Sequence, residues 1–464
     1  MGVNALSKKL RPSGQTPDSV AHSPELKGKR IGVDLSVVIH KALANIDGAG
    51  EYHVKPAISS FHFANKGIQI NKGIMLSNNK LRVGIIGCAD IAKKNCVAAS
   101  NPFASCRITA IASRSKDKAK DFVDEVFAGI MEEQRPTQLF SGADAYDKLL
   151  ESKESCDAVY IPLPTKLHVT YVGSALRNKK HVLLEKPVAV SAQSYRDMLS
   201  IASKEGKFLM DGTMFVHAAR TKQIVKAITN PNRVHFNFTF EGDEDFFKNN
   251  VRVKKEGDFM GCIGDLGWYG VRIALLVFSD MKSETLRQGL VKEVQVVNCE
   301  LNDEGVPIDA DFMVYFSEKR VLSMHCSFQH PLKQTLQIFG TGSEYTATVT
   351  DTILPYKGEH LEISLSKQDL IGFNQICCHE EKSLKASNTN VQEVCMWHNF
   401  ASWAQKIDEE SSQETADIEN EKWWGGDSDE VKAANDIASY SLHTQIVLDG
   451  LMESIQKGGV RIPL

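Results

Sequence analysis

LRVGIIGCADIA, residues 81–92, is the stretch of sequence that decides the fold. It opens with a short apolar run, Gly87 allows a tight turn, and apolar residues at helical spacing follow from Ile91 to Ser100. A second apolar run at 108–112 precedes a charged helical segment at 116–127. This strand, helix, strand order predicts the start of a parallel sheet crossed by helices.

The same alternation continues through the next hundred residues. Apolar spacing predicts helices at 146–151, 167–177 and 192–204, and strands at 158–161, 182–184 and 208–210. Strands that alternate with ten-residue helices indicate an α/β fold. We therefore expect a doubly wound parallel sheet with right-handed crossovers.

After about Val234 the pattern changes to strict alternation of apolar and polar residues. Runs at 234–240, 294–299, 312–316, 321–328 and 335–339 predict strands of a second, α+β domain with a large, mostly antiparallel open sheet. Helices are expected at 391–407 and 431–455. The acidic segment 408–429 carries Trp423 and Trp424, and we interpret it as a surface loop.

Composition excludes several classes of protein. The chain has 464 residues, of which 42% are hydrophobic and 24% charged, which is ordinary for a globular protein with two or three cores. It has no long apolar run and no secretory signal, so we expect a cytoplasmic protein without a membrane span. The ten cysteines contain no C-x-x-C pair and are expected to be reduced thiols. A net charge of −4 makes nucleic acid an improbable partner.

Residues 1–74 differ from the rest, with ten Lys and Arg against five Asp and Glu. Met1–Leu6 and the run 26–36, which contains the carboxylate of Asp34, resemble the amino-terminal segment of flap endonuclease (XPG-like) nucleases, in which such an Asp binds magnesium. The resemblance covers roughly residues 1–55. The further carboxylates that a two-metal site needs do not follow. We expect an inert, poorly ordered appendage.

The turn after the first strand could bind the pyrophosphate of a dinucleotide. Such a site needs a tight turn, close approach of the backbone to the phosphate, and a helix amino terminus with free N–H groups. Gly87 supplies the turn, and Ala89 and Ala92 stand where the second and third small residues of such a turn are usual. Asp90 and Ile91 complete this candidate site. Any strand-to-helix turn of an α/β protein offers the alternative interpretation.

The end of the second strand indicates which dinucleotide is preferred. An enzyme that prefers NAD would place Asp or Glu there, but this chain has Ser113 and Arg114, with Lys118 close behind. A hydroxyl and a guanidinium suit the 2′-phosphate of NADP. We therefore expect NADP, with NAD possible. The alternative is that Arg114 is a solvated residue at a helix start.

The loop after the next strand contains two prolines. Pro162, Leu163 and Pro164 must cross the sheet edge before a helix starts near Thr165, so the loop suits a flat wall for nicotinamide. His168 follows three residues later. By itself His168 is better explained as a helix-face histidine with a satisfied hydrogen bond than as a proton carrier.

A lysine and a tyrosine form the candidate catalytic pair. Glu185-Lys186-Pro187 closes an apolar strand, where open α/β sheets bind ligands, so all three residues are candidates for cofactor contact. Tyr269 is a poor base at neutral pH unless a positive charge such as Lys186 is near. Asp265 supplies a nearby carboxylate, although it could be an ordinary helix cap. No metal is required.

These stretches resemble one family. Residues 81–92, 161–168, 185–187 and 261–269 (GCIGDLGWY) are similar to the glucose-fructose oxidoreductase / inositol dehydrogenase / MocA family. The likeness is strongest to the branch with dimeric dihydrodiol dehydrogenase and D-xylose dehydrogenase, and it runs from about Lys80 to the carboxyl terminus. Many members have His where Tyr269 stands, but this branch has Tyr. The family often has Gly at Ala89 and Asn at Thr165.

The resemblance implies a Rossmann-type cofactor domain at 75–212 and a substrate-binding and dimerisation domain at 213–464. It implies that Lys186 is the catalytic lysine, Tyr269 the acid/base and Asp265 a supporting carboxylate. The nicotinamide wall would consist of Pro164, Thr165 and His168. Two further stretches, 210–217 with Arg220 and 242–246 with Arg252, are expected at the domain junction and the substrate rim.

The sequence thus predicts an NADP-dependent oxidoreductase that transfers a hydride between nicotinamide and a sugar or a cyclic or vicinal diol. Tyr269, assisted by Lys186, would act as acid/base, and the partners would be the small substrate and a second copy of the chain. One alternative is a non-catalytic NADP-binding sensor or structural subunit that kept the fold. Another is a nuclease activity of residues 1–55.

Overall fold

The structure is a computed structural model that describes residues 80–128, 135–343, 345–354, 360–371, 376–387, 391–410 and 416–464. The nuclease-like stretch 1–55 and the whole of segment 1–74 lie outside the described residues. The domain boundary expected at residue 75 lies outside them as well.

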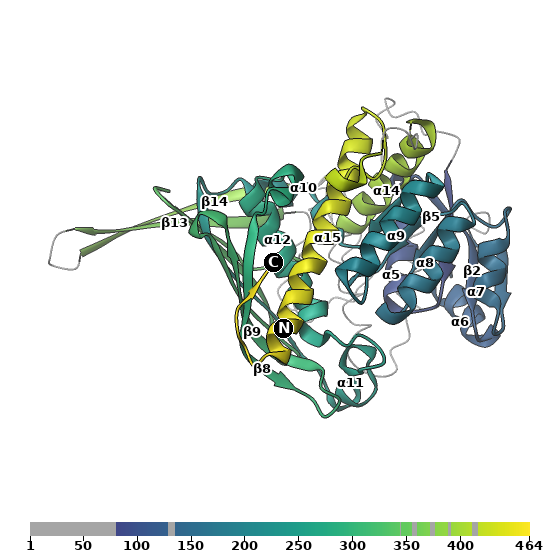
Figure 1. Cartoon of the computed structure of the whole chain (residues 1–464), viewed down its shortest axis with the longest axis horizontal. Coiled ribbons are helices and arrows are strands. Elements are labelled where there is room, and N and C mark those ends of the chain that lie inside the picture. The colour runs from purple at the N-terminus through teal and green to yellow at the C-terminus, as the bar shows by residue number, and fades with distance from the viewer. Residues whose placement is uncertain are drawn as a thin grey trace, which may run out of the picture.

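The first part of the chain forms a six-stranded parallel sheet in the order β3-β2-β1-β4-β5-β6, with helices packed on its faces (Figure 1). The strand order reverses direction at β1, as in doubly wound dinucleotide-binding folds. Its strands are β1 (Leu81–Ile86), β2 (Cys106–Ser113), β3 (Gln138–Ser141), β4 (Ala158–Ile161), β5 (His181–Leu184) and β6 (Leu209–Asp211). Its helices are α5 (Asp90–Ala99), α6 (Lys116–Val126), α7 (Ala145–Glu151), α8 (His168–Arg177) and α9 (Ala192–Glu205).

The predicted α/β fold is therefore confirmed, but one strand of the parallel sheet was missed. Strand β4 and strand β5 are buried along their whole length and read as apolar runs, which made them easy to predict. Strand β3 lies at the sheet edge, has no fully buried residue and is only four residues long. A short, half-exposed edge strand carries no apolar signature in the sequence.

The second sheet has nine strands in the order β14-β13-β12-β11-β7-β10-β9-β8-β15. All neighbouring pairs are antiparallel except β10 and β7, which run parallel, so the predicted mostly antiparallel sheet is confirmed. Its strands are β7 (Pro231–Glu241), β8 (Val291–Leu301), β9 (Pro307–Phe316), β10 (Val321–Ser327), β11 (Gln329–Gly340), β12 (Thr346–Val349), β13 (His360–Ile371), β14 (Ile376–Ser387) and β15 (Ile462–Pro463).

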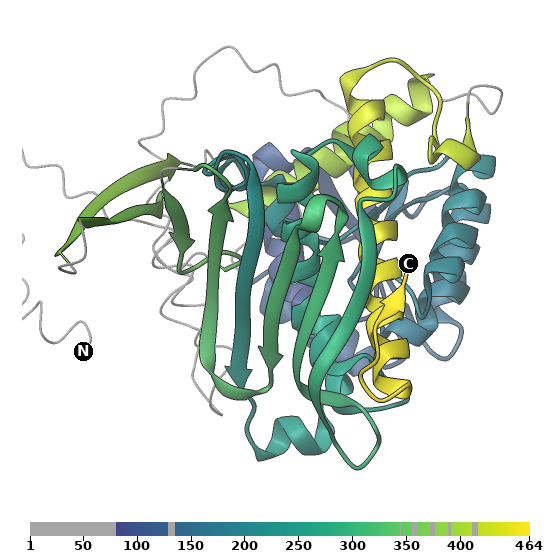
Figure 2. The ribbon, with the colours of Figure 1, turned by 60° about the vertical axis from the view of Figure 1, so that its left-hand side comes forward.

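Helices cover one face of this large sheet and leave the other open. Figure 2 shows the open face in front, with the helices behind it. Strands β13 and β14 form a long hairpin that extends away from the body of the molecule (Figure 1). The helices of this part are α10 (Ala219–Val225), α11 (Glu244–Asn249), α12 (Trp268–Ser279), α13 (Ser283–Arg287), α14 (Gln392–Glu410) and α15 (Asp429–Gln456).

The two long carboxyl-terminal helices return toward the parallel sheet. Helix α15 contacts β8 of the large sheet and also α9 and β6 of the parallel sheet, so it joins the two layers (Figure 1). Helix α14 packs on α5 and β2. In space, these carboxyl-terminal helices therefore complete the core of the part that comes first in the sequence.

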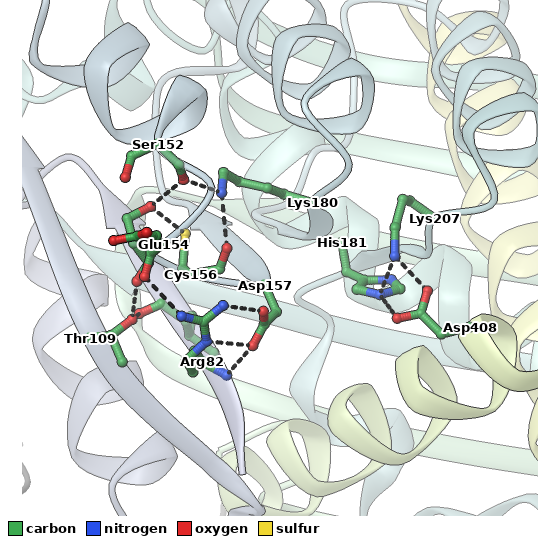
Figure 3. A network of polar contacts seen from close by, with 12 residues as sticks. Arg82, Thr109, Ser152, Glu154, Cys156, Asp157, Lys180, His181, Lys207 and Asp408 are labelled. Atoms are coloured by element: carbon green, nitrogen blue, oxygen red, sulfur yellow. Dashed lines mark hydrogen bonds and ion pairs between the residues drawn. The ribbon is translucent and has the colours of Figure 1, made fainter. Parts of the chain in front are cut away.

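A polar network ties the amino-terminal edge of the parallel sheet together (Figure 3). Arg82 at the start of β1 forms a two-pronged ion pair with Asp157, with Nε and Nη2 at 2.9 and 2.6 Å from the two carboxylate oxygens. Nearby, Asp408 of α14 contacts His181 Nε2 at 3.1 Å and Lys207 Nζ at 2.5 Å. The contacts of Asp408 attach α14 at the amino-terminal edge of the sheet. Ligands of such sheets bind at the opposite edge, at the carboxyl ends of the strands.

The segment expected to be an acidic surface loop, 408–429, differs from that expectation. Asp408 belongs to α14, and both indoles are buried, with Trp423 and Trp424 at 2% and 1% exposed. The ring of Trp424 packs edge-on against Phe208 at 5.1 Å between centroids, and its Nε1 donates to Lys207 O at 2.9 Å. Burial of two large apolar rings outweighs the charges around them in the sequence.

A completely buried ion pair joins the two parts of the molecule. Arg272 of α12 contacts Asp211 Oδ2 at 3.0 Å, and both side chains are 0% exposed. The guanidinium also bonds Thr444 Oγ1 of α15 and stacks over the ring of Trp268 at 5.3 Å. The stretch 210–217 thus lies at the domain junction, as the resemblance implied.

Among the described residues, none of the helices combines the length and the apolar character that a membrane crossing requires.

Candidate active site

The candidate site lies at the carboxyl ends of β1, β4 and β5. Gly87 follows β1 with a φ of +100°, a conformation that side chains disfavour, and its N–H donates to Ala112 O at 2.9 Å. A Cβ at Gly87 would lie 2.9 Å from Leu163 Cδ2, in the loop after β4. The expected turn and the expected proline loop therefore pack directly against each other.

The amino terminus of α5 is free to bind an anion. Ala89 occupies the cap position without a side-chain hydrogen bond, and the Asp90 side chain is 88% exposed. Ala92 is buried, so the methyl group at the third small position faces the core rather than the phosphate turn. The uncapped N–H groups at this helix start fit a pyrophosphate.

The end of β2 and the helix start after it provide exposed cations. Ser113 is buried, and its Oγ accepts from Ser115 N at 3.3 Å, whereas Arg114 and Lys118 are exposed. The Arg114 guanidinium lies close to the hydroxyl of Tyr146, a residue of α7. An exposed guanidinium at this strand end fits a 2′-phosphate. The Ser113 hydroxyl is turned toward the backbone of its own loop.

The loop after β4 is held from both sides. His168 is 1% exposed, and its Nδ1 and Nε2 lie 3.1 and 2.7 Å from the carbonyl oxygens of Val188 and Leu163. Burial lowers the pKa of His168 below its ordinary value. His168 therefore braces the loop from beneath, which agrees with the interpretation of a helix-face histidine with satisfied hydrogen bonds.

Thr165 binds a residue of the second domain. Its backbone N and its Oγ1 both donate to Asp258 Oδ1, at 3.1 and 2.6 Å. Thr165 stands where the family often has Asn, and its contact with Asp258 joins the proline loop to the segment before α12. The sequence did not identify Asp258, because an aspartate in a glycine-containing loop is an ordinary turn residue.

Glu185 belongs to a buried chain of hydrogen bonds. Its carboxylate accepts from the Tyr160 hydroxyl, which in turn accepts from Asn95 Nδ2 at 2.9 Å. Asn95 Oδ1 accepts from Trp397 Nε1 of α14 at 3.1 Å. Burial raises the pKa of Glu185 above its ordinary value. Glu185 thus fixes the end of β5 from below, next to Lys186.

Lys186 and Asp265 meet through a close approach of backbone segments. The Lys186–Pro187 peptide bond is cis, and Asp265 lies in a π-helical turn, Ile263–Gly267, that runs into α12. A Cβ at Gly264 would lie 3.0 Å from Pro187 Cγ, so only glycine allows the turn to approach this closely. Lys186 Nζ pairs with Asp265 Oδ1 and donates to Asp265 O at 3.1 Å.

Asp265 also pairs with Arg252, whose Nε lies 3.0 Å from Oδ2. Burial would raise the pKa of the Asp265 carboxyl, but Arg252 and Lys186 outweigh it and lower the pKa to about 2. Burial would lower the pKa of Lys186, but Asp265 and Tyr269 raise it above its ordinary value. The site therefore holds an ionised carboxylate between two cations, and Asp265 is no helix cap.

Tyr269 lies beside this cluster on the first turn of α12. Lys186 Nζ is 5.1 Å from the centroid of its ring, and Phe215 and Phe238 pack around it at 6.0 and 5.6 Å. Among the described residues, no group forms a hydrogen bond with the Tyr269 hydroxyl, which leaves it available to a substrate.

The proton affinity of Tyr269 corrects one expectation. Lys186 does favour the phenolate, but burial and the nearby carboxylates of Asp265 and Glu185 outweigh it, and the pKa of Tyr269 rises to about 12. A lysine next to the ring predicts a lowered pKa only if the ring stays solvated. Here the tyrosine is 7% exposed, and desolvation dominates.

In the two further stretches, Phe215 packs on Tyr269, but two other residues form their hydrogen bonds away from this cluster. Arg220 is buried and donates to the carbonyl oxygens of Asp351 and Ile353 and to Gln392 Oε1, at 3.3, 3.0 and 3.1 Å. Asp243 caps the short helix α11 through a bond from Phe246 N at 2.7 Å. Arg252 is the exception, because it reaches Asp265 and keeps 38% of its side chain exposed.

Comparisons with known proteins show the family of the chain. Residues 81–213 match the model of an oxidoreductase family with an NAD-binding Rossmann fold, and residues 219–346 match the GFO/IDH/MocA C-terminal domain. A dTDP-3,4-didehydro-2,6-dideoxy-alpha-D-glucose 3-reductase from Streptomyces violaceoruber is 30% identical over 253 residues, which are 53% of this chain and 69% of that protein. The chain therefore belongs to the GFO/IDH/MocA family of oxidoreductases.

Two other relatives show how far the likeness extends. The reductase of the same name from Actinomadura kijaniata is 38% identical over 148 residues, and the match spans 32% of this chain and only 40% of that protein. D-xylose 1-dehydrogenase (NADP(+)) 2 from Haloferax volcanii is 27% identical over 280 residues, covering 59% of this chain and 77% of that protein.

A solved structure shares the fold. It is a 3-ketoreductase from Actinomadura kijaniata in complex with NADP and TDP-benzene, with a TM-score of 0.61 and 22% sequence identity. The superposition covers 81% of this chain and 98% of that chain. At this level of identity, the similarity shows a common arrangement of the two sheets.

Proposed function

We propose that this protein is an NADP-dependent oxidoreductase that transfers a hydride between nicotinamide and a CH–OH group of a sugar or a cyclic or vicinal diol. The observation that carries the proposal is the meeting of Lys186, Asp265 and Tyr269 beside the ends of the parallel strands. The xylose dehydrogenase and the dTDP-sugar reductases among the relatives support this substrate class.

The cofactor would be held by groups at the start of α5 and at the end of β2. The uncapped start of α5 after Gly87 suits the pyrophosphate, and Arg114 suits the 2′-phosphate. The loop with Pro162, Leu163 and Pro164 would form the wall beside the nicotinamide. When bound, NADPH supplies the hydride, and NADP accepts it in the reverse direction.

The protein itself supplies the proton and fixes its donor. With a pKa of about 12, Tyr269 is a neutral phenol at physiological pH and can donate its proton to the oxygen of a carbonyl that is being reduced. The Lys186 ammonium then stabilises the phenolate that remains. Asp265 keeps Lys186 charged and in place. In the oxidative direction the phenolate would accept the proton of the substrate hydroxyl.

We also propose which part of the chain binds the cofactor and which binds the substrate. Residues 75–212 would bind the cofactor, and residues 213–464 the substrate and a second subunit. The open face of the nine-stranded sheet would join two copies into a cytoplasmic homodimer. Exposed apolar side chains on that side support the pairing, with Val297 at 63% and Leu332 at 51% exposed. Light scattering of the purified protein tests it.

The test of the activity uses NADPH absorbance with a panel of aldoses, ketosugars and diols. We expect Lys186→Ala and Tyr269→Phe to reduce turnover by about 10²–10⁴-fold, as for the loss of a general acid, while NADPH binding measured by fluorescence persists. Tyr315→Phe, on the large sheet away from the site, is the matched control. Full turnover in both active-site variants would refute the roles of Lys186 and Tyr269. Absence of turnover by the unaltered protein with every substrate of the panel would leave a non-catalytic NADP-binding protein.

A further inference from the structure

Three potential metal ligands meet on the nine-stranded sheet, in a place that the proposed reaction does not use. His325 Nε2 and His330 Nε2 lie 3.1 and 3.4 Å from the same oxygen, Asp309 Oδ2. One ligand atom from each of the three side chains lies within 4.8 Å of the others. Each residue comes from a different strand, β9, β10 and β11.

The register of the strands explains the meeting. Asp309 pairs with Ser327 across β9 and β10, and His325 lies two residues earlier on the same face of β10. Buried residues alternate with His325 along β10, so its side chain points away from the core. Asp309 and His325 are therefore diagonal neighbours on one face of the sheet.

An irregularity in β11 brings the third residue, His330, close to Asp309 and His325. The pairing of β11 with β7 shifts between Gln329 and Lys333, so His330, Pro331 and Leu332 form a bulge. Thr239 Oγ1 holds this bulge by donating to Pro331 O at 2.7 Å. Bulges redirect side chains, and this one turns the ring of His330 toward that of His325, with centroids 5.3 Å apart.

The cluster is partly enclosed. The side chains of Asp309, His325 and His330 are 12%, 28% and 54% exposed. Asn237 and Thr239 line the same hollow together with Lys333.

We propose that Asp309, His325 and His330 bind a divalent first-row transition metal of the Zn²⁺ type through Asp309 Oδ2 and the two Nε2 atoms. Ligands about 2.0–2.1 Å from a tetrahedral Zn²⁺ are about 3.3–3.4 Å from each other, close to the separations found here. Two imidazoles and one carboxylate are a ligand set for zinc and its neighbours rather than for Mg²⁺ or Ca²⁺. A fourth position stays open to water or to a group of a second subunit.

The metal would take the place of the contacts that the two imidazoles make with the one carboxylate oxygen. Binding Zn²⁺ through Nε2 requires that the proton of each neutral ring be on Nδ1, so that the Nε2 lone pair faces the metal. The site would clamp the β11 bulge to β9 and β10, so its expected effect is on the stability of this sheet rather than on the chemistry at Tyr269.

The experiment measures metal binding directly, with full-length protein that carries no polyhistidine tag and has been dialysed against a chelator. We expect titration with Zn²⁺ in a calorimeter to show one equivalent per chain, and Co²⁺ to give the visible absorption bands of a tetrahedral site. Mg²⁺ should not compete. His325→Ala, His330→Ala and Asp309→Asn should each abolish the Co²⁺ bands.

The matched control is His235→Ala. His235 is an exposed histidine on β7 that packs against Phe339 and is not part of the cluster. It should bind the metal as the unaltered protein does, and circular dichroism should show that every variant is folded. Absence of stoichiometric Zn²⁺ binding, or Co²⁺ bands that persist in His325→Ala, would overturn the proposal. Because the readout is binding, its failure would leave the proposed oxidoreductase activity unaffected.

Discussion

The ammonium nitrogen of Lys186 lies 5.1 Å from the centroid of the Tyr269 ring, although 83 residues separate the two in the chain. Asp265 holds this ammonium from the other side. The lysine thus lies between a carboxylate that keeps it charged and a phenol whose conjugate base it would stabilise. This arrangement sets the expected response of the enzyme to pH.

The raised pKa of Tyr269 predicts different pH profiles for the two reaction directions. Below a pKa of about 12 the phenol is protonated, so carbonyl reduction should depend little on pH near neutrality. Alcohol oxidation needs the phenolate, and kcat/KM should rise by up to about tenfold per pH unit over this range. Steady-state rates in both directions between about pH 6 and about pH 10 check this. A plateau of the oxidation rate near neutral pH would contradict it.

Asp265→Asn should lower the activity, and it should lower the free energy of unfolding at neutral pH. The folded-state pKa of Asp265 is about 2, below the ordinary value of about 3.9, so the ionised carboxylate stabilises the folded protein above pH of about 4. That contribution is lost as the pH falls toward about 2. The urea midpoints of the unaltered protein and the variant should therefore differ most at neutral pH and converge in acid.

The control for this comparison is Asp303→Asn, which alters an exposed aspartate in the turn before β9. Its urea midpoint should follow that of the unaltered protein at every pH. If the gap between Asp265→Asn and the unaltered protein stayed constant from neutral pH to acid, the ion pairs with Lys186 and Arg252 would not be its source.

Arg114→Ala should change the preference for the cofactor. A hydrogen bond to a charged group contributes about 1.5–3 kcal/mol, and we take the lower end for an exposed side chain, so kcat/KM with NADP should fall about tenfold. NAD lacks the 2′-phosphate, and its kcat/KM should stay almost unchanged. Arg107→Ala, at the other end of β2, should alter neither value. Equal losses with both cofactors would argue against a contact with the 2′-phosphate.

Arg272→Met should destabilise the junction of the two sheets. Removing one partner of a buried ion pair costs about 3–5 kcal/mol, because Asp211 would keep a buried charge without its cation. Chemical denaturation measures this change in the free energy of unfolding. Lys148→Met breaks the exposed pair with Asp144 and should leave the midpoint near that of the unaltered protein. A similar small change in both variants would contradict the prediction.

Local patterns in the sequence were sufficient for much of the fold and for the core of the candidate site. Alternating apolar strands and helices predicted the parallel sheet, and the missed strand β3 is short and half-exposed. Lys186 and Tyr269 could be identified because they stand in the short motifs at 185–187 and 261–269. Asp258 was missed because its partner, Thr165, is 93 residues away. The burial of Trp423 and Trp424 was missed because the residues that cover them lie far away in the sequence.

The sequence by itself determined much of the order of strands and helices, the tight turn at Gly87 and the residue types of the candidate catalytic pair. These depend on backbone periodicity and on side-chain chemistry within a few residues. Only the tertiary structure decided that Asp265 pairs with Lys186 and Arg252, that desolvation raises the pKa of Tyr269, and that Asp309, His325 and His330 meet. Proton affinity and ligand geometry depend on distances and burial, which folding sets between residues far apart in the chain.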